Sequence, residues 1–348
     1  MQNELIIEGE YLRDILDQPK ALEDTLTALG ENIALNNLAN RYHKGGFQRI
    51  VLTGMGSSFH ALYPLNLQLL EHGFNTVMAE TSELVHYMPR LLDQSSLIIV
   101  VSQSGFSAEV LRLIELNRGE AAILAVTNTP DSPLAQNADA SVLTRAGREF
   151  SVATKTYVTA LMALESVGAI LCGCNHDQIE EELALAGPAV RSYLNDWENH
   201  VDCIASKLYQ IRHLFLAGRG ASIAAAATGA LVLKESTHFH AEGMSSAAFR
   251  HGPFELVDEG SFVLVFLGDG RTSDLNRNLV QDLLRLGGRA VLVSEEESDL
   301  AFRLPSVPHR VRPIVEILPV QIISLVLAAQ AGREAGRLIL ASKITTTE

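Results

Sequence analysis

The feature that most constrains the fold of this chain is an internal duplication of short apolar runs, four of which end in glycine-containing turns. These runs lie at residues 50–53, 97–101, 122–126, 214–217, 262–267 and 290–293. Gly54 and Gly105, in the turns after the first two runs, match Gly218 and Gly270 in the second half at an offset of about 165 residues. Because nearly the same offset recurs at two separate turns, the sequence predicts a tandem duplication of one domain.

Patterns typical of helices separate the apolar runs, as at 59–70 and 108–116. Runs that are apolar throughout are typical of strands buried on both faces, and helices between them favour a parallel sheet. The chain has 348 residues, of which 47% are hydrophobic and 20% charged, which suits two globular domains. We therefore expect an α/β fold with two tandem domains, each containing a parallel sheet covered by helices.

Charge and hydropathy exclude several classes of function. The net charge of −14 argues against nucleic-acid binding, which needs a basic surface. No apolar run reaches the roughly 18 residues that a membrane span needs, and the start of the sequence does not resemble a signal peptide. We expect a cytoplasmic protein that binds neither nucleic acid nor a membrane.

The cysteines and histidines predict neither disulfides nor a metal site. Cys172, Cys174 and Cys203 are an odd number in a long chain, which suits a reducing compartment rather than a disulfide framework. His238 and His240 are two residues apart and share no helix face, and the CGC stretch at 172–174 lacks the spacing of metal ligands. We expect no metal and no cofactor.

Two hydroxyl-rich turns follow neighbouring strands of the first copy, at the carboxyl ends where open parallel sheets bind ligands. Each turn precedes a helix, so unpaired backbone N–H groups and the helix dipole point to the same place. The candidate phosphate ligands, here called the cradle, are Ser57, Ser58, Ser102, Gln103, Ser104 and Ser107. Serines in such turns also serve as helix caps, and that alternative stays open. Two such turns together favour a phosphate site.

The cradle predicts a phosphate monoester that is bound but not transferred. It contains no lysine, and the nucleotide-binding pattern GxxxxGK[ST] is absent from the sequence. A dinucleotide fingerprint would need a third glycine where Phe59 stands. The corresponding turn of the second copy, Gly268-Asp269-Gly270, places an acid where a phosphate would bind. We therefore expect one phosphate site, in the first copy.

Three residues are candidates for chemistry, although the local pattern of each also fits a solvent-exposed residue. Glu235 ends an apolar helical pattern at 224–236, where a raised pKa would suit a proton shuttle, but it also fits a solvated helix end. His251 lies in an Arg-His-Gly-Pro turn, which more often holds a loop histidine than a catalyst. Lys343 lies near the end of the sequence, where a lone lysine is usually exposed.

Taken together, the motifs resemble a known family. GMGSS, VVSQSGFS, VATK, LKES followed by HAE, RHGP, and a lysine before a threonine-rich end resemble the sugar isomerase (SIS) domain family. Their order is most similar to the isomerase half of glutamine–fructose-6-phosphate aminotransferases, the glucosamine-6-phosphate synthases. The resemblance implies two flavodoxin-like three-layer αβα domains that bind a sugar phosphate without metal or cofactor. It also implies that the glutaminase domain of those synthases is missing here.

The resemblance assigns roles to single residues. Glu235 matches the carboxylate that transfers a proton between C1 and C2, and Lys343 the lysine that forms a Schiff base with a ketose. His251 matches the histidine that opens the sugar ring, which the family donates across a homodimer interface. Ala153 and Thr154 match sugar-binding positions, although the chain is one residue shorter there. The resemblance also supports the cradle as the phosphate site.

The resemblance orders the chain into five parts. We expect a helical segment at 1–40, the first SIS domain with the phosphate site at 41–180 and a helical linker at 181–205. The second SIS domain is expected at 206–335, and a tail with the active-site lysine at 336–348.

The expected activity is aldose–ketose isomerisation of an amino-sugar 6-phosphate with loss of the amine. Glucosamine 6-phosphate giving fructose 6-phosphate and ammonia is the first choice, and a fructosyl-amine 6-phosphate deglycase is close behind. One alternative is a synthase subunit that takes ammonia from a separate glutaminase. Another is a sensor without chemistry, which is favoured by Val232 and Ala248 at positions where the family has a lysine and a glutamate.

Overall fold

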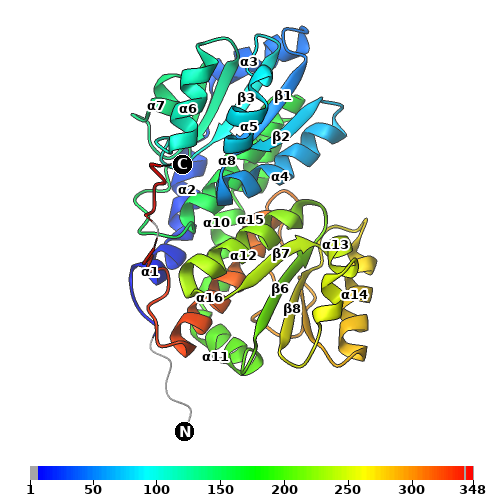
Figure 1. Cartoon of the computed structure of the whole chain (residues 1–348). Coiled ribbons are helices and arrows are strands. Elements are labelled where there is room, and N and C mark those ends of the chain that lie inside the picture. Colours follow the sequence, from blue (N-terminus) through cyan, green and yellow to red (C-terminus); the bar gives the residue numbers. More distant parts are fainter. Residues whose placement is uncertain (1–6, 341, 348) are drawn as a thin grey trace. The chain divides into compact units, whose positions relative to one another are not determined.

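The computed structural model describes residues 7–340 and 342–347 (Figure 1). The chain forms two compact units, each discontinuous in sequence. The first unit comprises Lys20–Arg148, Lys155–Ala184 and Leu340–Glu348, and the second comprises Met1–Pro19, Glu149–Thr154 and Leu185–Ile339. The expected boundaries follow the sequence from end to end, whereas the structure groups three short segments differently: Met1–Pro19 and Glu149–Thr154 lie with the second unit, and the tail from Leu340 lies with the first.

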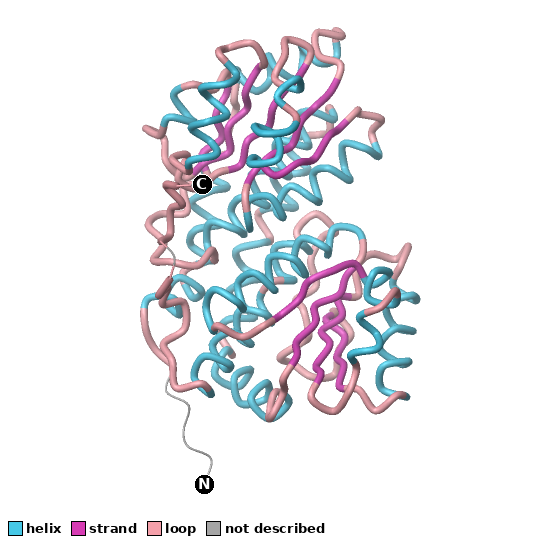
Figure 2. The backbone as a smooth tube through the Cα atoms, viewed as in Figure 1, coloured by secondary structure: helices cyan, strands magenta, loops and turns pink. Residues whose placement is uncertain are grey.

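The first unit contains a five-stranded sheet in the order β2-β1-β3-β4-β5, with every neighbouring pair parallel (Figures 1 and 2). Its strands are β1 (Arg49–Gly54), β2 (Thr76–Glu80), β3 (Ser96–Val101), β4 (Ala122–Thr127) and β5 (Ala140–Leu143). Its helices are α2 (Gln18–Ala28), α3 (Ile33–His43), α4 (Gly56–Glu71), α5 (Thr81–Tyr87), η1 (Pro89–Leu91), α6 (Ala108–Asn117), α7 (Pro133–Gln136), α8 (Lys155–Cys172) and α9 (His176–Leu183). The runs expected at 50–53, 97–101 and 122–126 are therefore confirmed as β1, β3 and β4.

The second unit repeats the arrangement with a four-stranded parallel sheet in the order β7-β6-β8-β9. Its strands are β6 (His213–Gly218), β7 (Ala241–Ser245), β8 (Ser261–Phe266) and β9 (Arg289–Val293). Its helices are α1 (Glu10–Leu16), α10 (Ala186–Leu194), α11 (Trp197–Lys207), η2 (Gly220–Ser222), α12 (Ile223–Thr237), α13 (Ser246–Arg250), η3 (Pro253–Leu256), α14 (Ser273–Arg285), α15 (Arg312–Glu316) and α16 (Leu318–Gln330). The expected duplication and the α/β class are confirmed.

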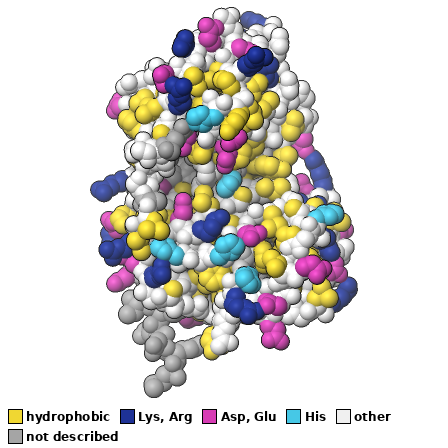
Figure 3. Space-filling view, viewed as in Figure 1, with side chains coloured by type: hydrophobic (Ala, Val, Ile, Leu, Met, Phe, Trp, Pro, Cys, Tyr) yellow, Lys and Arg dark blue, Asp and Glu magenta, His cyan; other side chains and the backbone are white. Residues whose placement is uncertain are grey.

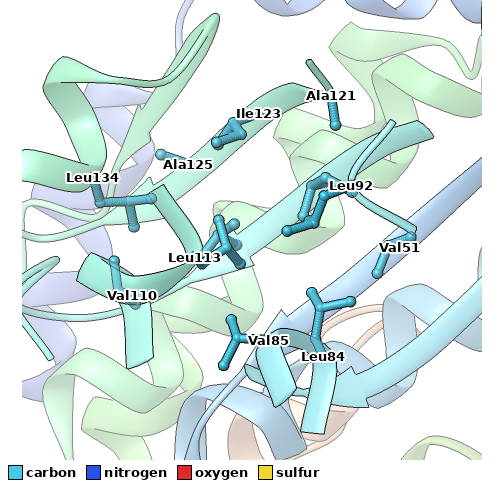
Figure 4. Packing of buried hydrophobic residues seen from close by; sticks show 12 residues of the cluster. Val51, Leu84, Val85, Leu92, Val110, Leu113, Ala121, Ile123, Ala125 and Leu134 are labelled. Carbon is cyan, nitrogen blue, oxygen red and sulfur yellow. The ribbon is translucent and has the colours of Figure 1, made fainter. Parts of the chain in front are cut away.

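The core of the first unit explains why its central strands are apolar throughout. All six residues of β3 are buried, because helices cover both faces of the sheet. On one face, Leu84 of α5 and Leu113 of α6 pack in one apolar cluster (Figure 4). Ile98 and Val100 of β3 belong to the same cluster. The carboxyl ends of β1 and β3 are thereby fixed side by side, which positions the two hydroxyl-rich turns.

A close contact between α4 and α8 covers the other face of this sheet. A Cβ atom added to Gly168 of α8 would lie 2.1 Å from Oε1 of Gln68 in α4. The absence of a side chain at Gly168 therefore leaves the space that the Gln68 amide occupies. Both polar atoms of the Gln68 amide are buried, and neither has a hydrogen-bond partner among the described residues. An unpaired buried amide costs folding free energy.

Two helical segments, Lys155–Cys172 and Arg312–Gln330, are long and apolar enough to cross a membrane. In each, 89% of the tested window is buried inside the structure, as in the core helix of a globular domain.

The face of the molecule drawn in Figure 3 carries acidic and basic side chains interspersed with one another.

Candidate functional site

The turn after β3 is built so that two serine hydroxyls remain able to donate. Ser102 Oγ accepts a hydrogen bond from Gly105 N at 3.1 Å, and Ser104 Oγ accepts one from Phe106 N at 3.2 Å. Each oxygen therefore takes a backbone hydrogen and keeps its own O–H hydrogen for a ligand. Gly105 makes this turn possible, since its φ is +66° and an added Cβ would lie 2.3 Å from Ser132 Oγ.

The same turn is fastened to the neighbouring strand end. The carbonyl oxygen of Gln103 accepts hydrogen bonds from Asn128 N at 3.1 Å and from the hydroxyls of Thr127 and Thr129, each at 3.3 Å. Three donors on one carbonyl hold the backbone in place while the side chain of Gln103 stays partly exposed. These hydrogen bonds fix the backbone of the turn and thereby the positions of its polar side chains.

The turn after β1 brings the second set of hydroxyls to the same edge of the sheet. An added Cβ at Gly54 would lie 2.9 Å from the carbonyl oxygen of Val101, so the ends of β1 and β3 approach closely. Ser57 and Ser58 lie in the first turn of α4 and are partly buried. No side chain caps this helix start, because its N-cap residue is Met55. Backbone N–H groups and the helix dipole are thus available to an anion there.

The start of α6 adds Ser107 and a contact with the tail. Ser107 is the N-cap residue, but its side chain makes no capping hydrogen bond. The first N–H of the helix, that of Ala108, instead donates to the carbonyl oxygen of Thr345 at 3.1 Å. The tail that carries Lys343 therefore lies against the cradle within the first unit, and Lys343 is partly buried.

The corresponding edge of the second unit is occupied by a carboxylate of the chain itself. Ser222, in the turn after β6, donates to Glu316 Oε1 at 2.7 Å, and Glu316 is 1% exposed. Burial raises the pKa of Glu316 to about 7, against the lowering effect of Ser222 and of the Arg312 charge. The adjoining cavity, which Asp269 also lines, measures about 10 Å³, room for one water molecule.

The sequence pointed to Asp269, in the turn after β8, as the acid at this edge of the second unit, and it did not point to Glu316. Nothing in the sequence marks Glu316, because it lies on α15, far along the chain from both turns. The residues around Glu316 form no recognisable motif, and only the fold brings this carboxylate to Ser222.

Glu235 lies in the last turn of α12 and is partly buried. Its neighbour Ser236 is buried, and so is Val232, one helical turn earlier. The phenol of Tyr11 is also buried nearby: burial chiefly raises its pKa, and the charge of Glu235 raises it further. The phenol contacts Ser324 Oγ at 3.0 Å. Glu235 thus lies at the border between a buried polar cluster and solvent.

The other expected residues of the second unit differ in exposure. His251 is exposed and follows α13, where its N–H donates to Ala248 O at 2.9 Å. Thr154 is fully buried, and both its N–H and its hydroxyl donate to Glu149 Oε1, at 2.9 and 3.1 Å. Ala153 is partly exposed. The hydroxyl of Thr154 is therefore engaged within the chain, and Ala153 is the more accessible of the two residues.

The predicted residues are divided between the two units. The cradle and Lys343 belong to the first unit, and Glu235, His251, Ala153 and Thr154 to the second. Within the ranges that the structure describes, no three His, Cys, Asp or Glu side chains gather as metal ligands would.

Two stretches of the chain, residues 47–169 and 207–331, match the SIS domain. The chain belongs to the SIS domain family. Each SIS domain contains one pair of the strand-end turns described above, so the duplication seen in the sequence is a pair of SIS domains.

Curated relatives resemble nearly the whole chain. Glutamine–fructose-6-phosphate aminotransferase (isomerizing) of Pyrococcus horikoshii is 31% identical over 97% of this chain and 57% of its own length. The enzyme of the same name from Sulfolobus acidocaldarius is 30% identical over 97% of this chain and 56% of its own length. The chain spans a little over half the length of the relatives it matches.

Solved structures share the fold of both SIS domains. The C-terminal domain of glucosamine-fructose-6-phosphate aminotransferase from Francisella tularensis aligns over 95% of this chain and 98% of its own, with a TM-score of 0.84 and 24% identity. A glucosamine-6-phosphate deaminase from Thermotoga maritima aligns over 97% of this chain and 100% of its own, with a TM-score of 0.77 and 18% identity. At these identities the likeness establishes the fold.

Proposed function

We propose that this chain is a phosphosugar enzyme that moves a proton between C1 and C2 of an open-chain amino-sugar 6-phosphate and releases the amine. The proposed reaction is glucosamine 6-phosphate plus water giving fructose 6-phosphate plus ammonia. The observation that carries the proposal is the cradle, in which Ser102 and Ser104 each accept from the backbone and keep an O–H to donate.

The cradle suits the phosphate of a sugar for electrostatic reasons. In a chain of net charge −14, a dianionic ligand must be held by local donors. Two helix starts and several hydroxyls supply such donors without a cation that would assist phosphoryl transfer. The phosphate then serves as a handle, and the chemistry takes place at the other end of the sugar.

The chemical steps use residues that the family resemblance assigns. His251 moves the proton that opens the ring, and Glu235 takes the proton from C2 and returns it to C1. The double bond shifts from C1–O to C2–N, giving a ketimine. The amine of Lys343 exchanges with this nitrogen and releases ammonia, and water hydrolyses the lysine imine to fructose 6-phosphate. No metal or cofactor takes part in the proposal.

The proposed assembly is a homodimer in the cytoplasm, in which His251 serves the partner's sugar. The exposure of His251 in the described chain supports this arrangement, since a catalytic histidine must reach substrate. Ala153 and Thr154 are proposed to border the sugar through the backbone of their segment.

The first test is ammonia release coupled to detection of fructose 6-phosphate, with purified protein and glucosamine 6-phosphate. Glu235→Gln is expected to lower kcat by about 100-fold or more, in the range of general acid–base catalysis. Glu198→Gln, which removes an exposed carboxylate from α11, is the matched control and should keep wild-type turnover. Equal activity in wild type and Glu235→Gln would refute the role of the acid.

A second candidate is the synthesis direction, and the names of the relatives that are 31% and 30% identical favour it. On this alternative, the chain combines fructose 6-phosphate with ammonia that a separate glutaminase supplies. Incubation with fructose 6-phosphate and ammonium chloride, followed by detection of glucosamine 6-phosphate, tests it directly. Turnover of a fructosyl-amine 6-phosphate alone would instead identify a deglycase.

A sensor without chemistry is the non-enzymatic alternative, and the fully buried Val232 supports it, because the family has a lysine at this position. A sensor would bind sugar phosphate without turnover of any of these substrates. In that case Lys343→Ala should leave the affinity nearly unchanged, since phosphate binding alone would suffice.

A further inference from the structure

The segment that follows α16 and leads to the tail, residues 332–336 and here called the tail root, is fixed on the second unit at Gly336. Gly336 N donates to the carbonyl oxygen of Ser236 at 3.0 Å, and Ser151 Oγ donates to the carbonyl oxygen of Gly336. Both backbone polar groups of this one residue are therefore bonded. Their partners are the neighbour of Glu235 and a member of the segment that carries Ala153 and Thr154.

The side chain of Tyr11 lies directly against Gly336. A Cβ added to Gly336 would lie 2.6 Å from Cγ and 2.7 Å from Cβ of Tyr11, and the φ of Gly336 is +77°. Tyr11 is 1% exposed, so it has no open space to move into. Only glycine satisfies both the conformation and the contact.

The phenol of Tyr11 is itself held in place. Ser324 donates its only hydroxyl hydrogen to Gln321 O at 2.6 Å, so the bond of 3.0 Å between Tyr11 and Ser324 runs from the phenol to the serine. Ser236 is a second hydroxyl facing the phenol. Tyr11 therefore joins α1 to α16 and α12 and cannot yield to a larger residue at 336.

A second tie holds the tail root farther upstream. Arg333 Nη1 lies 2.7 Å from His238 Nδ1, and His238 is the C-cap of α12 with a φ of +59°. The tail root is thus tied to the end of α12 at two residues that closely follow Glu235, at Ser236 and at His238.

We propose that Gly336 and Tyr11 form a clamp that fixes the tail root on the helix end bearing Glu235, and that this clamp sets the position from which Lys343 acts. The inference rests on the proposed function, in which Lys343 forms an imine. Lys343 lies seven residues beyond Gly336. A chain of that length reaches at most about 25 Å, so the fixed root limits where the amine can go. Gly336 and Tyr11 are positioning residues in this proposal.

The test compares Gly336→Ala with Gly332→Ala. Gly332 also has a positive φ, of +66°, but an added Cβ there meets no atom within 4 Å, so it carries the backbone penalty without the clash. Ser151→Ala is a milder second variant, because it removes only the hydroxyl that donates to Gly336. Two readouts are used: the rate of tryptic cleavage after Arg337, and borohydride trapping of Lys343 with fructose 6-phosphate, both by mass spectrometry.

The clamp predicts that Gly336→Ala is cleaved after Arg337 about 10-fold faster than wild type and trapped at Lys343 about 10-fold more slowly. Ser151→Ala should shift both rates in the same direction by about threefold, and Gly332→Ala should stay near wild type. The concentration of inorganic phosphate that competes with fructose 6-phosphate for binding should be the same in all three variants, because the cradle lies in the first unit. Unchanged phosphate competition also shows that the first unit of a variant is folded.

The two hypotheses fail in different ways. If wild-type protein is not trapped at Lys343, the imine of the proposed function is refuted, whereas the cleavage rates still report on the clamp. If Gly336→Ala and Ser151→Ala are cleaved at the wild-type rate, the clamp is refuted whatever the activity. If Gly332→Ala loosens the tail as much as Gly336→Ala, backbone strain explains the effect and the contact with Tyr11 does not.

Discussion

The turns after β3 and β8 correspond in sequence, yet the strand-end edges of the two units to which they belong treat negative charge in opposite ways. In the first unit, Ser104 presents a hydroxyl at the end of the sheet, and its counterpart in the second unit is Asp269. In the second unit, Ser222 donates to the buried carboxylate of Glu316. The first edge offers donors to an external anion, and the second satisfies its donor with an internal one.

This difference teaches that a strand-end site depends on what distant elements bring to it as much as on the turn. Both turns precede a helix, and both helices have N-cap residues whose side chains make no capping bond, Ser107 and Thr272. The helix dipole is therefore available at each edge. A buried carboxylate from α15 occupies the second edge, and we expect it to disfavour a phosphate there.

The largest effect is expected from removing the donors of the open edge. Ser102→Ala combined with Ser104→Ala removes two hydroxyls that would bond to a charged phosphate, so the affinity for fructose 6-phosphate should fall by about 100-fold or more. Isothermal titration calorimetry measures this affinity. Thr272→Ala removes a hydroxyl from the matching turn of the second unit and should leave it unchanged. A comparable loss in Thr272→Ala would mean that both edges bind the ligand.

A pair of glycine substitutions separates the two turns by stability. Gly105→Ala introduces a side chain at a φ of +66° and within 2.3 Å of Ser132 Oγ. We expect it to lower the free energy of unfolding by about 2–3 kcal/mol. Gly270→Ala, at the corresponding position, meets no atom within 4 Å and has no positive φ, so it should change stability by less than about 0.5 kcal/mol. Urea unfolding compares the two, and equal losses would contradict the difference in turn geometry.

The buried carboxylate of the closed edge predicts a pH effect. The pKa of Glu316 is about 7 in the folded chain, against about 4.3 for an unfolded glutamate. Between these two pH values the folded state therefore binds more protons than the unfolded state. The contribution of Glu316 to the free energy of unfolding is fully present below pH ~4.3 and is lost as the pH rises through ~7. Glu316→Gln should flatten this decline, by about 2–3 kcal/mol between pH 5 and pH 8. Thermal unfolding across this range measures it, and a variant with the wild-type slope would exclude Glu316 as its source.

Much of the fold could be predicted because the central strands carry an unambiguous signal. β1, β3, β4, β6 and β8 are buried along nearly their whole length, and the sequence shows them as apolar runs. β2 and β7 are edge strands of their sheets and are only partly buried, so Glu80 and Glu242 interrupt them. Without a run of apolar residues, these strands gave no signal.

The site could be predicted only as far as its chemistry is local. The cradle serines follow strands and precede helices, so turn chemistry and strand ends single them out as candidates. Glu316 and Tyr11 act through contacts that the fold creates between distant segments. A helix residue such as Glu316 has the same local pattern whether it faces solvent or a buried serine.

The contact of Gln68 with Gly168 has a practical consequence for all the variants above. The amide of Gln68 is buried without a hydrogen-bond partner among the described residues, so methionine, of similar length and no amide, should fit the same space. Gln68→Met is expected to raise the melting temperature of the first unit, with a gain of about 1 kcal/mol. The core between α4 and α8 thus offers a thermostabilised background in which damaging substitutions at the cradle can be expressed, purified and crystallised.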